Sequence, residues 1–409
     1  MSERKYRLLL VSSQPIQNPA SLRLMAKHPK LEILVAYCSL PNDSKIQASS
    51  LKQNPEYLTK VLFDIPLLEG YPWSYVPNRS PVPSLNKTFG LINPGLIKLV
   101  QKCDVCLVYG YAYISFWLAI AAAKIARKPL LLSTDATYLD PPDGIGGNWK
   151  IPIKKKALPY LYNHIADAVL VLSSASKTFT HSLGVPESRI FLTPYVVDND
   201  YIAEIAKQTS RQQVRAELDI PEDAVIAVFC AKFIPRKRPQ DVIEAFAKAN
   251  VPNTYLVMIG DGPLKADLTS QAQHLGIESK IRFTGLVQYS RLPSLYASSN
   301  VLAFSSEYEP YGLPVNEAMI CGIPVVVSDR IGAGYDLVEE GVTGFTYPCG
   351  NIDALATLFQ TLLGNPKQLQ IMGKAARERI RTWSPQQHVE SLVKAVEAVV
   401  VPPSLPFNR

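Results

Sequence analysis

Two glutamates, Glu309 and Glu317, stand at the ends of the short Gly/Pro-rich stretch EPYGLPVNE. The apolar runs at residues 300–306 before it and 323–328 after it are typical of buried strands. Pro314 suits the first turn of a helix, so the pattern predicts a strand, a loop, a short helix and a second, parallel strand. In such sheets ligands bind beyond the carboxyl ends of the strands, where helix N-termini direct free N–H groups outward.

A purely structural explanation stays open for one of the two glutamates. Glu317 is expected in the first helical turn, where the helix dipole favours a carboxylate by roughly 0.3–1 kcal/mol. Glu309 has no such explanation, because it lies in the loop itself, before Pro310 and Tyr311. This loop is therefore predicted to come close to a ligand.

Lysines flank a second predicted strand-to-helix loop, in the stretch AKFIPRKRPQD. Lys232 and Lys237 are those lysines, and Pro239 is expected to open the helix. A helix N-terminus with two nearby cations can bind a diphosphate, although lysines are often only solvated surface charges. The turn GDGP, which starts at Gly260 and Asp261, follows the next predicted strand in the same way. The chain contains no P-loop sequence, which excludes a P-loop ATPase.

The elements that must position these residues form a regular alternation of strands and helices. At 409 residues the chain exceeds what one hydrophobic core usually supports, so two domains are expected. We predict an α/β fold of two doubly wound, Rossmann-like domains that face each other across a central cleft. The predicted domains are residues 1–204 and 205–384, with a helical stretch at 205–220 between the halves. An amphipathic C-terminal helix and tail, 385–409, is expected to pack back on the first domain.

Composition and charge narrow the functional class. The chain is 47% hydrophobic and 19% charged, which is ordinary for a globular enzyme, and its net charge is +7. The Lys and Arg residues lack the basic-aromatic organisation of a nucleic-acid binder, so nucleic acid is not an expected partner. No signal peptide is visible at the N-terminus, which favours a cytoplasmic location.

Two local patterns suggest other functions but have simpler structural explanations. Cys103 and Cys106 form a C-x-x-C pair in a predicted strand, where positions three apart point to opposite faces and cannot share a metal. The run at residues 105–123 has no charge and reaches the length of a membrane span. Gly110 divides it into a β-rich part and an Ala-rich part, so a strand, a turn and a buried helix are favoured.

The second half of the chain resembles the retaining glycosyltransferases of family 4, within glycosyl transferases group 1, which have the two-domain GT-B fold. The resemblance covers most of the chain and is strongest from about residue 225 to residue 384. Glu309 and Glu317 match the family's Glu-x7-Glu motif. Lys232 and Lys237 match the basic pair of its Gly-Arg-x4-Lys-Gly loop.

The resemblance implies that the second domain binds a nucleotide-sugar donor and the first domain binds the acceptor. Glu309 would face the donor sugar and stabilise oxocarbenium-like charge, and Glu317 would accept hydrogen bonds from the ribose hydroxyls. Lys232, Lys237 and helix dipoles would neutralise the leaving diphosphate, so no metal and no other cofactor are expected. Further donor-binding positions would be Gly260, Asp261, Val287, Tyr311, Gly312 and Leu313.

Several positions depart from the family pattern. The glycines beside the basic pair are replaced by Ala231 and Arg238, which puts the shape of the phosphate loop in question. Family members commonly have a histidine at the end of the fourth strand, and here Asp135 is the nearest polar residue. Asp135 could take over sugar binding or simply cap a turn. Residues 12–20 take the place of the family's Gly-rich loop without a glycine, and the aromatic stretch 63–78 could line an acceptor groove or pack as a loop.

The sequence therefore predicts a retaining, metal-independent glycosyltransferase with a glycan, lipid-linked or small-molecule acceptor, as in polysaccharide biosynthesis. Two alternatives stay open: a non-catalytic relative that binds a glycan or a partner protein, and a GT-B sugar-nucleotide epimerase. Peripheral contact with the inner face of the membrane through the basic first domain is compatible with a lipid-linked acceptor. The donor, the acceptor and the oligomeric state do not follow from the sequence.

Overall fold

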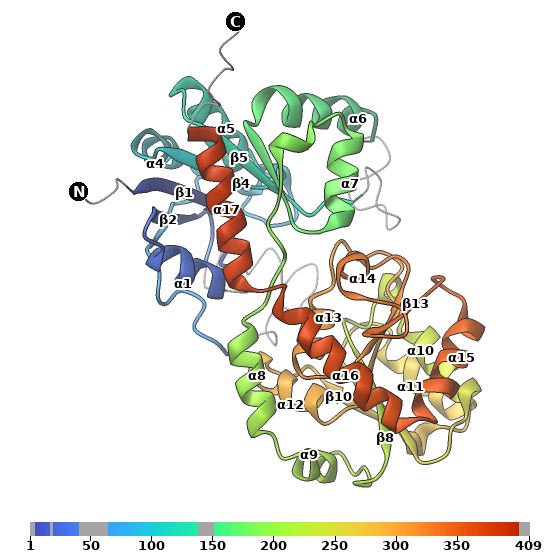
Figure 1. Ribbon diagram of the computed structural model, residues 1–409. Coiled ribbons are helices and arrows are strands. Elements are labelled where there is room, and N and C mark those ends of the chain that lie inside the picture. The colour runs from blue at the N-terminus through green and yellow to red at the C-terminus, as the bar shows by residue number, and fades with distance from the viewer. Residues whose placement is uncertain (1–4, 17–18, 41–63, 138–150, 401–409) are drawn as a thin grey trace, which may run out of the picture.

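The chain folds into two units, each built around one parallel sheet (Figure 1). The computed structural model describes residues 5–16, 19–40, 64–137 and 151–400. Strands from residues 6–192 form the first sheet, and strands from residues 225–347 form the second. Hydrophobic cores lie on both faces of each sheet, so the predicted α/β class with two doubly wound units is confirmed.

The first sheet has seven strands in the order β3-β2-β1-β4-β5-β6-β7. Its central strands are continuous apolar runs because helices bury both of their faces. In β1, Leu9 and Val11 face the core with α4 and α5, whereas Leu8 and Leu10 face the core with α1 and α17. The strands are β1 Tyr6–Ser12, β2 Leu31–Tyr37, β3 Trp73–Tyr75, β4 Val105–Tyr109, β5 Leu130–Thr134, β6 Ala168–Val171 and β7 Ile190–Leu192.

The second sheet has six strands in the order β10-β9-β8-β11-β12-β13. Its central strand β8 is also buried on both faces: Ile226 and Val228 belong to one core, and Ala227 and Phe229 to the other. The strands are β8 Val225–Cys230, β9 Thr254–Ile259, β10 Ile281–Gly285, β11 Val301–Phe304, β12 Val325–Ser328 and β13 Gly344–Tyr347.

Helices connect the strands and cover the sheets (Figure 1). Among the described residues, those of the first unit are α1 Ala20–Lys27, α4 Leu96–Lys102, α5 Ile114–Ile125, α6 Ile151–Tyr160 and α7 Ser174–Ser182. In the second they are α8 Asn199–Gln208, α9 Arg211–Glu217, α10 Pro239–Ala249, α11 Lys265–His274, α12 Leu292–Ala297, α13 Leu313–Ile320, α14 Gly332–Leu337, α15 Ile352–Leu363 and α16 Pro366–Arg381. The last helix, α17 Pro385–Val400, returns to the first unit.

Two described segments lead the chain from one unit to the other (Figure 1). Residues 193–198, the first crossing segment, lead from β7 to α8, and residues 382–384 lead from α16 to α17. Because α8 begins at Asn199 and packs on α12 and α13, the first crossing lies ahead of the predicted boundary at residue 204. The final helix α17 packs on α1, β6 and β7.

Some elements differ from those expected. The stretch 205–220 is not one helix: α8 ends at Gln208, and Ser210 starts α9 by accepting a hydrogen bond from the Gln213 N–H at 3.3 Å. The strands β3 and β13 were not predicted. Residues 64–78, the described part of the stretch 63–78, pack against the first sheet: the Tyr71 hydroxyl lies 2.8 Å from the hydroxyl of Tyr37 in β2. Phe63 lies outside the described residues.

The uncharged run at residues 105–123 forms β4 and most of α5, with Gly110 between them at φ +93°. The predicted strand, turn and buried helix are thus confirmed. Within the described ranges, no helix is both long enough and apolar enough to cross a membrane. The reasoning about the cysteine pair was wrong: Cys103 follows α4, outside the strand, and shares one core with Cys106.

Candidate active site

A cavity of about 470 Å³, which we call the donor cavity, lies at the carboxyl ends of the second sheet's strands. The first unit contributes Asp135 to its wall, and the first crossing segment contributes Tyr195 and Val197. Of the predicted site residues, all except Asp261 line it: Asp135, Lys232, Lys237, Gly260, Val287, Glu309, Tyr311, Gly312, Leu313 and Glu317.

The loop before α13 brings backbone N–H groups to the donor cavity. Gly312 precedes the helix with φ +105°, and a Cβ there would approach Phe304 to 3.0 Å and Ile331 to 3.1 Å, so the turn needs glycine. Within the described residues, the N–H groups of Gly312 and Leu313 donate no hydrogen bond. Both groups can therefore bind an anionic or hydroxyl-bearing ligand at the N-terminus of α13.

Glu309 and Lys237 form an ion pair in the wall of the donor cavity. Only 16% of the Glu309 side chain and 10% of the Lys237 side chain are exposed. Burial, and then the charges of Arg236 and Lys232, lower the pKa of Lys237, whereas the contacting Glu309 carboxylate favours the charged lysine. The pair holds Glu309 in place, and a bound diphosphate would compete with Glu309 for Lys237.

The loop that carries Lys237 is fixed at the end of β11. The Ser305 hydroxyl lies 2.9 Å from the Lys237 carbonyl and 2.8 Å from the Arg238 carbonyl and donates to them. Arg238 has φ +48°, a left-handed conformation that glycine adopts more readily, and its guanidinium donates to both Asp241 carboxylate oxygens at 2.6 and 3.2 Å. Arg238 therefore forms the turn into α10 where the family pattern has a glycine.

Arg236 is a third cation at the donor cavity, and it was not predicted. Its guanidinium donates to the Tyr308 carbonyl at 3.1 Å. This hydrogen bond joins residues 232–237, which we call the cationic loop, to the loop that carries Glu309. Its position between Lys232 and Lys237 in one short loop was the signal that could have identified it.

Glu317 lies deeper in the protein than expected. Because α13 begins at Leu313, Glu317 is the fifth helical residue, beyond the first turn where the dipole acts most strongly. Its side chain is buried, and the Tyr296 hydroxyl donates to its Oε2 at 3.1 Å. Burial raises the pKa of Glu317 to about 7, and hydrogen bonds from Tyr296 and Tyr289 act in the opposite direction. Tyr289 lines the same cavity and was not predicted.

Gly260 and Val287 line the side of the donor cavity that follows β9 and β10. A Cβ on Gly260 would lie 1.9 Å from the Ala231 carbonyl oxygen, so only glycine lets these two loops approach each other. Asp261 is not brought to the cavity, because its carboxylate accepts a hydrogen bond from the Gly262 N–H at 2.8 Å within its own turn. The GDGP turn thus contributes backbone to the site and no carboxylate.

Asp135 follows β5 and lines both the donor cavity and a neighbouring cavity in the first unit, which we call the acceptor-side cavity. The Asp135 side chain is exposed, and desolvation by the surrounding protein raises the pKa of its carboxyl. Tyr195 also lines both cavities and was not predicted. Its ring packs on Tyr311 at 5.3 Å between centroids, and its carbonyl accepts hydrogen bonds from Asn316 and Trp383, each at 3.1 Å.

The assembled groups offer three cations and free backbone N–H groups for an anion, beside the three carboxyl groups of Asp135, Glu309 and Glu317, which can accept hydrogen bonds from hydroxyls. In the part of the chain that the structure describes, no three His, Cys, Asp or Glu side chains are arranged to hold a metal ion.

Comparison with known families places this cavity in a recognised domain. The family model described as glycosyl transferases group 1 matches residues 210–379. The chain is 29% identical over 216 residues to N-acetyl-alpha-D-glucosaminyl L-malate synthase of Bacillus anthracis, covering 53% of this chain and 55% of that protein. It is 29% identical over 236 residues to a GDP-mannose-dependent alpha-(1-6)-phosphatidylinositol monomannoside mannosyltransferase of Mycolicibacterium smegmatis, covering 56% and 60%. The chain thus spans between half and two thirds of the length of these relatives.

Solved structures share the fold over nearly the whole chain. Anabaena HepE in complex with UDP and glucose superposes with a TM-score of 0.69 at 21% identity, covering 96% of this chain and 100% of that one. Sucrose-phosphate synthase of Thermosynechococcus elongatus gives 0.67 at 20% identity, covering 96% and 98%. The family model and the relatives thus identify residues 210–379 as a glycosyl transferases group 1 domain, and the solved structures show that the whole chain shares their two-unit fold.

Proposed function

We propose that this protein transfers a sugar from a nucleotide-sugar donor to a hydroxyl group of an acceptor. The observation that carries the proposal is that Lys232, Arg236 and Lys237 line the same cavity as Glu309 and Glu317. Cations suit a diphosphate, and carboxylates suit the hydroxyl groups of a sugar and a ribose. In support, the Mycolicibacterium relative is named as GDP-mannose-dependent, and the HepE structure holds UDP and glucose.

In the proposed reaction the bond between the sugar C1 and the diphosphate oxygen breaks, and the acceptor oxygen forms a new bond to C1. The products are the glycoside, the nucleoside diphosphate and a proton. The three cations and the N–H groups of Gly312 and Leu313 stabilise the negative charge of the leaving diphosphate. Glu309, released when the diphosphate takes Lys237, stabilises the positive charge that develops on the sugar.

We infer that the reaction needs no metal ion, because three protein cations are available at the place of the diphosphate. We also infer that the anomeric configuration is retained, since Glu309 and Glu317 match the spacing of the retaining family's motif. The proposed acceptor is a glycan or a lipid-linked sugar bound in the acceptor-side cavity. Asp135 lies between the two substrates in this arrangement, because it lines both cavities.

The test is a donor screen followed by a turnover assay. UDP-, GDP- and ADP-linked sugars are added to the protein, and a rise in Tm identifies the donor, because a ligand stabilises the state that it binds. Release of the nucleoside diphosphate is then measured with glycan and lipid-linked acceptors, with and without EDTA. We expect a glycoside with the donor's anomeric configuration, determined by NMR, at a rate that EDTA does not change.

Substitutions assign the activity to the donor cavity. Glu309→Gln should lower the turnover rate strongly while the donor still raises Tm, and Glu307→Gln, at an exposed neighbouring position, should leave the rate unchanged. Donor binding without any product would favour a non-catalytic binding protein. Conversion of the donor into an epimerised sugar nucleotide would favour an epimerase, and strict dependence on a divalent ion would contradict the metal-free reaction.

A further inference from the structure

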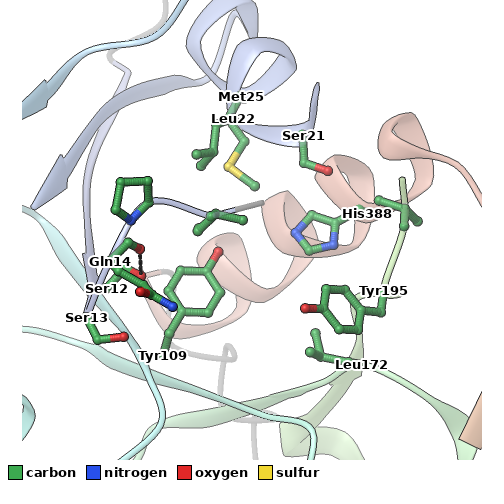
Figure 2. A pocket seen from close by; sticks show the side chains of 13 residues that line it. Ser12, Ser13, Gln14, Ser21, Leu22, Met25, Tyr109, Leu172, Tyr195 and His388 are labelled. Carbon is green, nitrogen blue, oxygen red and sulfur yellow. Dashed lines mark hydrogen bonds between the residues drawn. The ribbon is translucent and has the colours of Figure 1, made fainter. Parts of the chain in front are cut away.

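A cavity of about 300 Å³ lies between residues 12–16, at and after the end of β1, and the start of α17 (Figure 2). Its walls come from the end of β1 and the loop after it, from α1, from the ends of β4 and β6, from the first crossing segment and from α17. All of its lining residues that the structure describes belong to the first unit, this segment or α17, and none carries a carboxylate, an ammonium or a guanidinium group. We call it the inner cavity.

Three polar side chains from different elements point into the inner cavity (Figure 2). They are Tyr109 at the end of β4, Tyr195 in the first crossing segment, and His388 in α17. Within the described part of the chain, the two tyrosine hydroxyls and the Nε2 atom of His388 have no hydrogen-bond partner. Burial raises the pKa of Tyr195 to about 12 and lowers the pKa of His388, so these groups are uncharged at neutral pH.

The hydrogen bond of His388 fixes which ring nitrogen can accept. Its Nδ1 lies 2.9 Å from the Pro194 carbonyl, and a carbonyl oxygen only accepts hydrogen bonds, so Nδ1 carries the proton. In a neutral imidazole the other nitrogen, Nε2, is then an acceptor. The inner cavity thus offers one nitrogen acceptor and two tyrosine hydroxyls that can donate or accept, beside the serine and glutamine side chains that also line it. Leu22, Met25 and Leu172 form an apolar wall beside them.

This mixture of groups selects one class of ligand. A phosphate or a carboxylate would be buried here without a compensating cation, which is costly. A wholly apolar group would leave three polar groups without partners, which is also costly. A sugar or cyclitol ring has hydroxyl groups for the polar side and C–H faces for the apolar wall, and it carries no charge.

The inner cavity continues toward the reacting centre. It shares Ser13, Gln14, Tyr109, Leu172 and Tyr195 with the acceptor-side cavity. An acceptor whose reacting ring lies beside Asp135 can therefore place its next ring among these residues.

We propose that the inner cavity binds a neutral sugar or cyclitol ring of the acceptor, adjacent to the ring that carries the reacting hydroxyl. The part that concerns the acceptor rests on the proposed glycosyltransferase function. The acceptor is accordingly at least two rings long, and Tyr109, Tyr195 and His388 recognise the second ring.

The test uses neutral rings as probes and does not require the natural acceptor. Saturation-transfer NMR measures the binding of myo-inositol, methyl α-glucoside and methyl α-maltoside, with glucose 6-phosphate as the anionic comparison. Tyr109→Phe removes one hydroxyl. His388→Asn keeps an amide N–H near the position of Nδ1 for the Pro194 carbonyl and removes the Nε2 acceptor. Each substitution should weaken binding about tenfold, as expected for one lost hydrogen bond.

The matched control is Lys98→Ala, at an exposed position of α4 that lines none of the three cavities, and it should bind the neutral probes as the unmutated protein does. The proposal is overturned if no neutral ring binds, if both folded variants bind as tightly as the unmutated protein, or if glucose 6-phosphate binds more tightly. If one variant is unstable, the other gives the same readout. Neutral-ring binding combined with a failed donor screen would reject the glycosyltransferase function and keep the ligand class. A working donor with no ring binding would reject only this inference.

Discussion

The Asp336 carboxylate accepts a hydrogen bond from the backbone N–H of Ser174, at 3.0 Å, across the boundary between the two units. Asp336 lies on α14 of the second unit, and Ser174 is the first residue of α7 in the first. A carboxylate that caps a helix N-terminus typically contributes about 1 kcal/mol. A residue of one unit thus caps a helix of the other, and the contact stabilises the observed arrangement of the two units.

Removing this cap should loosen the contact between the units. Asp336→Ala is expected to increase the radius of gyration of the ligand-free protein, measured by small-angle X-ray scattering. The control is Ser173→Ala, because Ser173 accepts from the Ser176 N–H at 3.1 Å within α7 itself. This control should lower Tm without changing the radius of gyration. Equal radii for Asp336→Ala and the unmutated protein would contradict a role in holding the units together.

Substitutions of the two glutamates in the donor cavity should change different kinetic constants. Glu309→Gln is expected to lower kcat more than it raises the donor KM, because an interaction that strengthens in the transition state appears in the rate. Above pH 7, where Glu317 is mostly ionised, Glu317→Gln is expected mainly to raise the donor KM, since one charged hydrogen-bond acceptor is worth about 1.5–3 kcal/mol. Steady-state kinetics of both folded variants measures the two effects. A Glu309→Gln enzyme with the unmutated kcat would disprove its catalytic role.

The cationic loop should recognise the diphosphate and not the nucleoside. Lys232→Ala and Lys237→Ala are each expected to weaken nucleoside-diphosphate binding by about 1.5–3 kcal/mol, the value of a charged hydrogen bond. Isothermal titration calorimetry with the diphosphate and with the bare nucleoside separates the contributions. Lys248→Ala, at a more exposed ion pair, serves as the control. If the unmutated protein binds both ligands equally well, the loop is not a diphosphate site.

Glu317 should make stability depend on pH. Its pKa of about 7 in the folded state lies above the usual value of 4.5, so its favourable contribution is complete below pH 4.5 and is lost as the pH rises to 7. The Glu317→Gln side chain does not titrate. When the pH is raised from 5 to 8, the free energy of unfolding of the unmutated protein should therefore fall, relative to that of the variant, by on the order of 2–3 kcal/mol. Urea denaturation at both pH values measures this. Glu390→Gln, at an exposed position, should show no such gain, and an equal gain there would refute the assignment to Glu317.

The left-handed residue before α10 offers a test of backbone strain. Arg238→Gly and Arg238→Ala both lose the ion pair with Asp241, but only glycine adopts φ +48° without strain. The alanine variant should therefore be less stable than the glycine variant by about 1 kcal/mol. Thermal denaturation of the two variants measures the difference directly. Equal Tm values would show that the turn relaxes when Arg238 is replaced.

The main strands could be predicted because a strand buried on both faces is a continuous apolar run. β1 and β8, which are covered by helices on both sides, show this signal along most of their length. β3 does not, because it is a three-residue edge strand whose Trp73 and Tyr75 are exposed. The break between α8 and α9 could not be predicted, because it depends on the single cap at Ser210 while the sequence pattern across the whole stretch is helical.

The cationic and acidic parts of the site could be predicted for a topological reason. β8 and β11 pair in parallel, so the loops that follow them, with Lys237 and Glu309, meet at one edge of the sheet. Tyr195 and His388 could not be predicted, because the two crossings of the chain bring them to the cavities and no local pattern marks them. The burial of Glu317 could not be predicted either, because it results from packing around Tyr296 and the spacing of the two glutamates carries no information about that packing.

The return of α17 to the first unit has a consequence for biosynthesis. Val389, Leu392 and Val396 complete the core that contains Leu8 and Leu10 of β1. The ribosome makes the first unit before the second, yet α1 covers only part of this face of the first sheet, and the rest stays exposed until α17 has been translated. Exposed apolar surface on a nascent chain favours aggregation and chaperone binding. The growing chain is therefore expected to engage chaperones throughout translation of the second unit and to complete its first domain last.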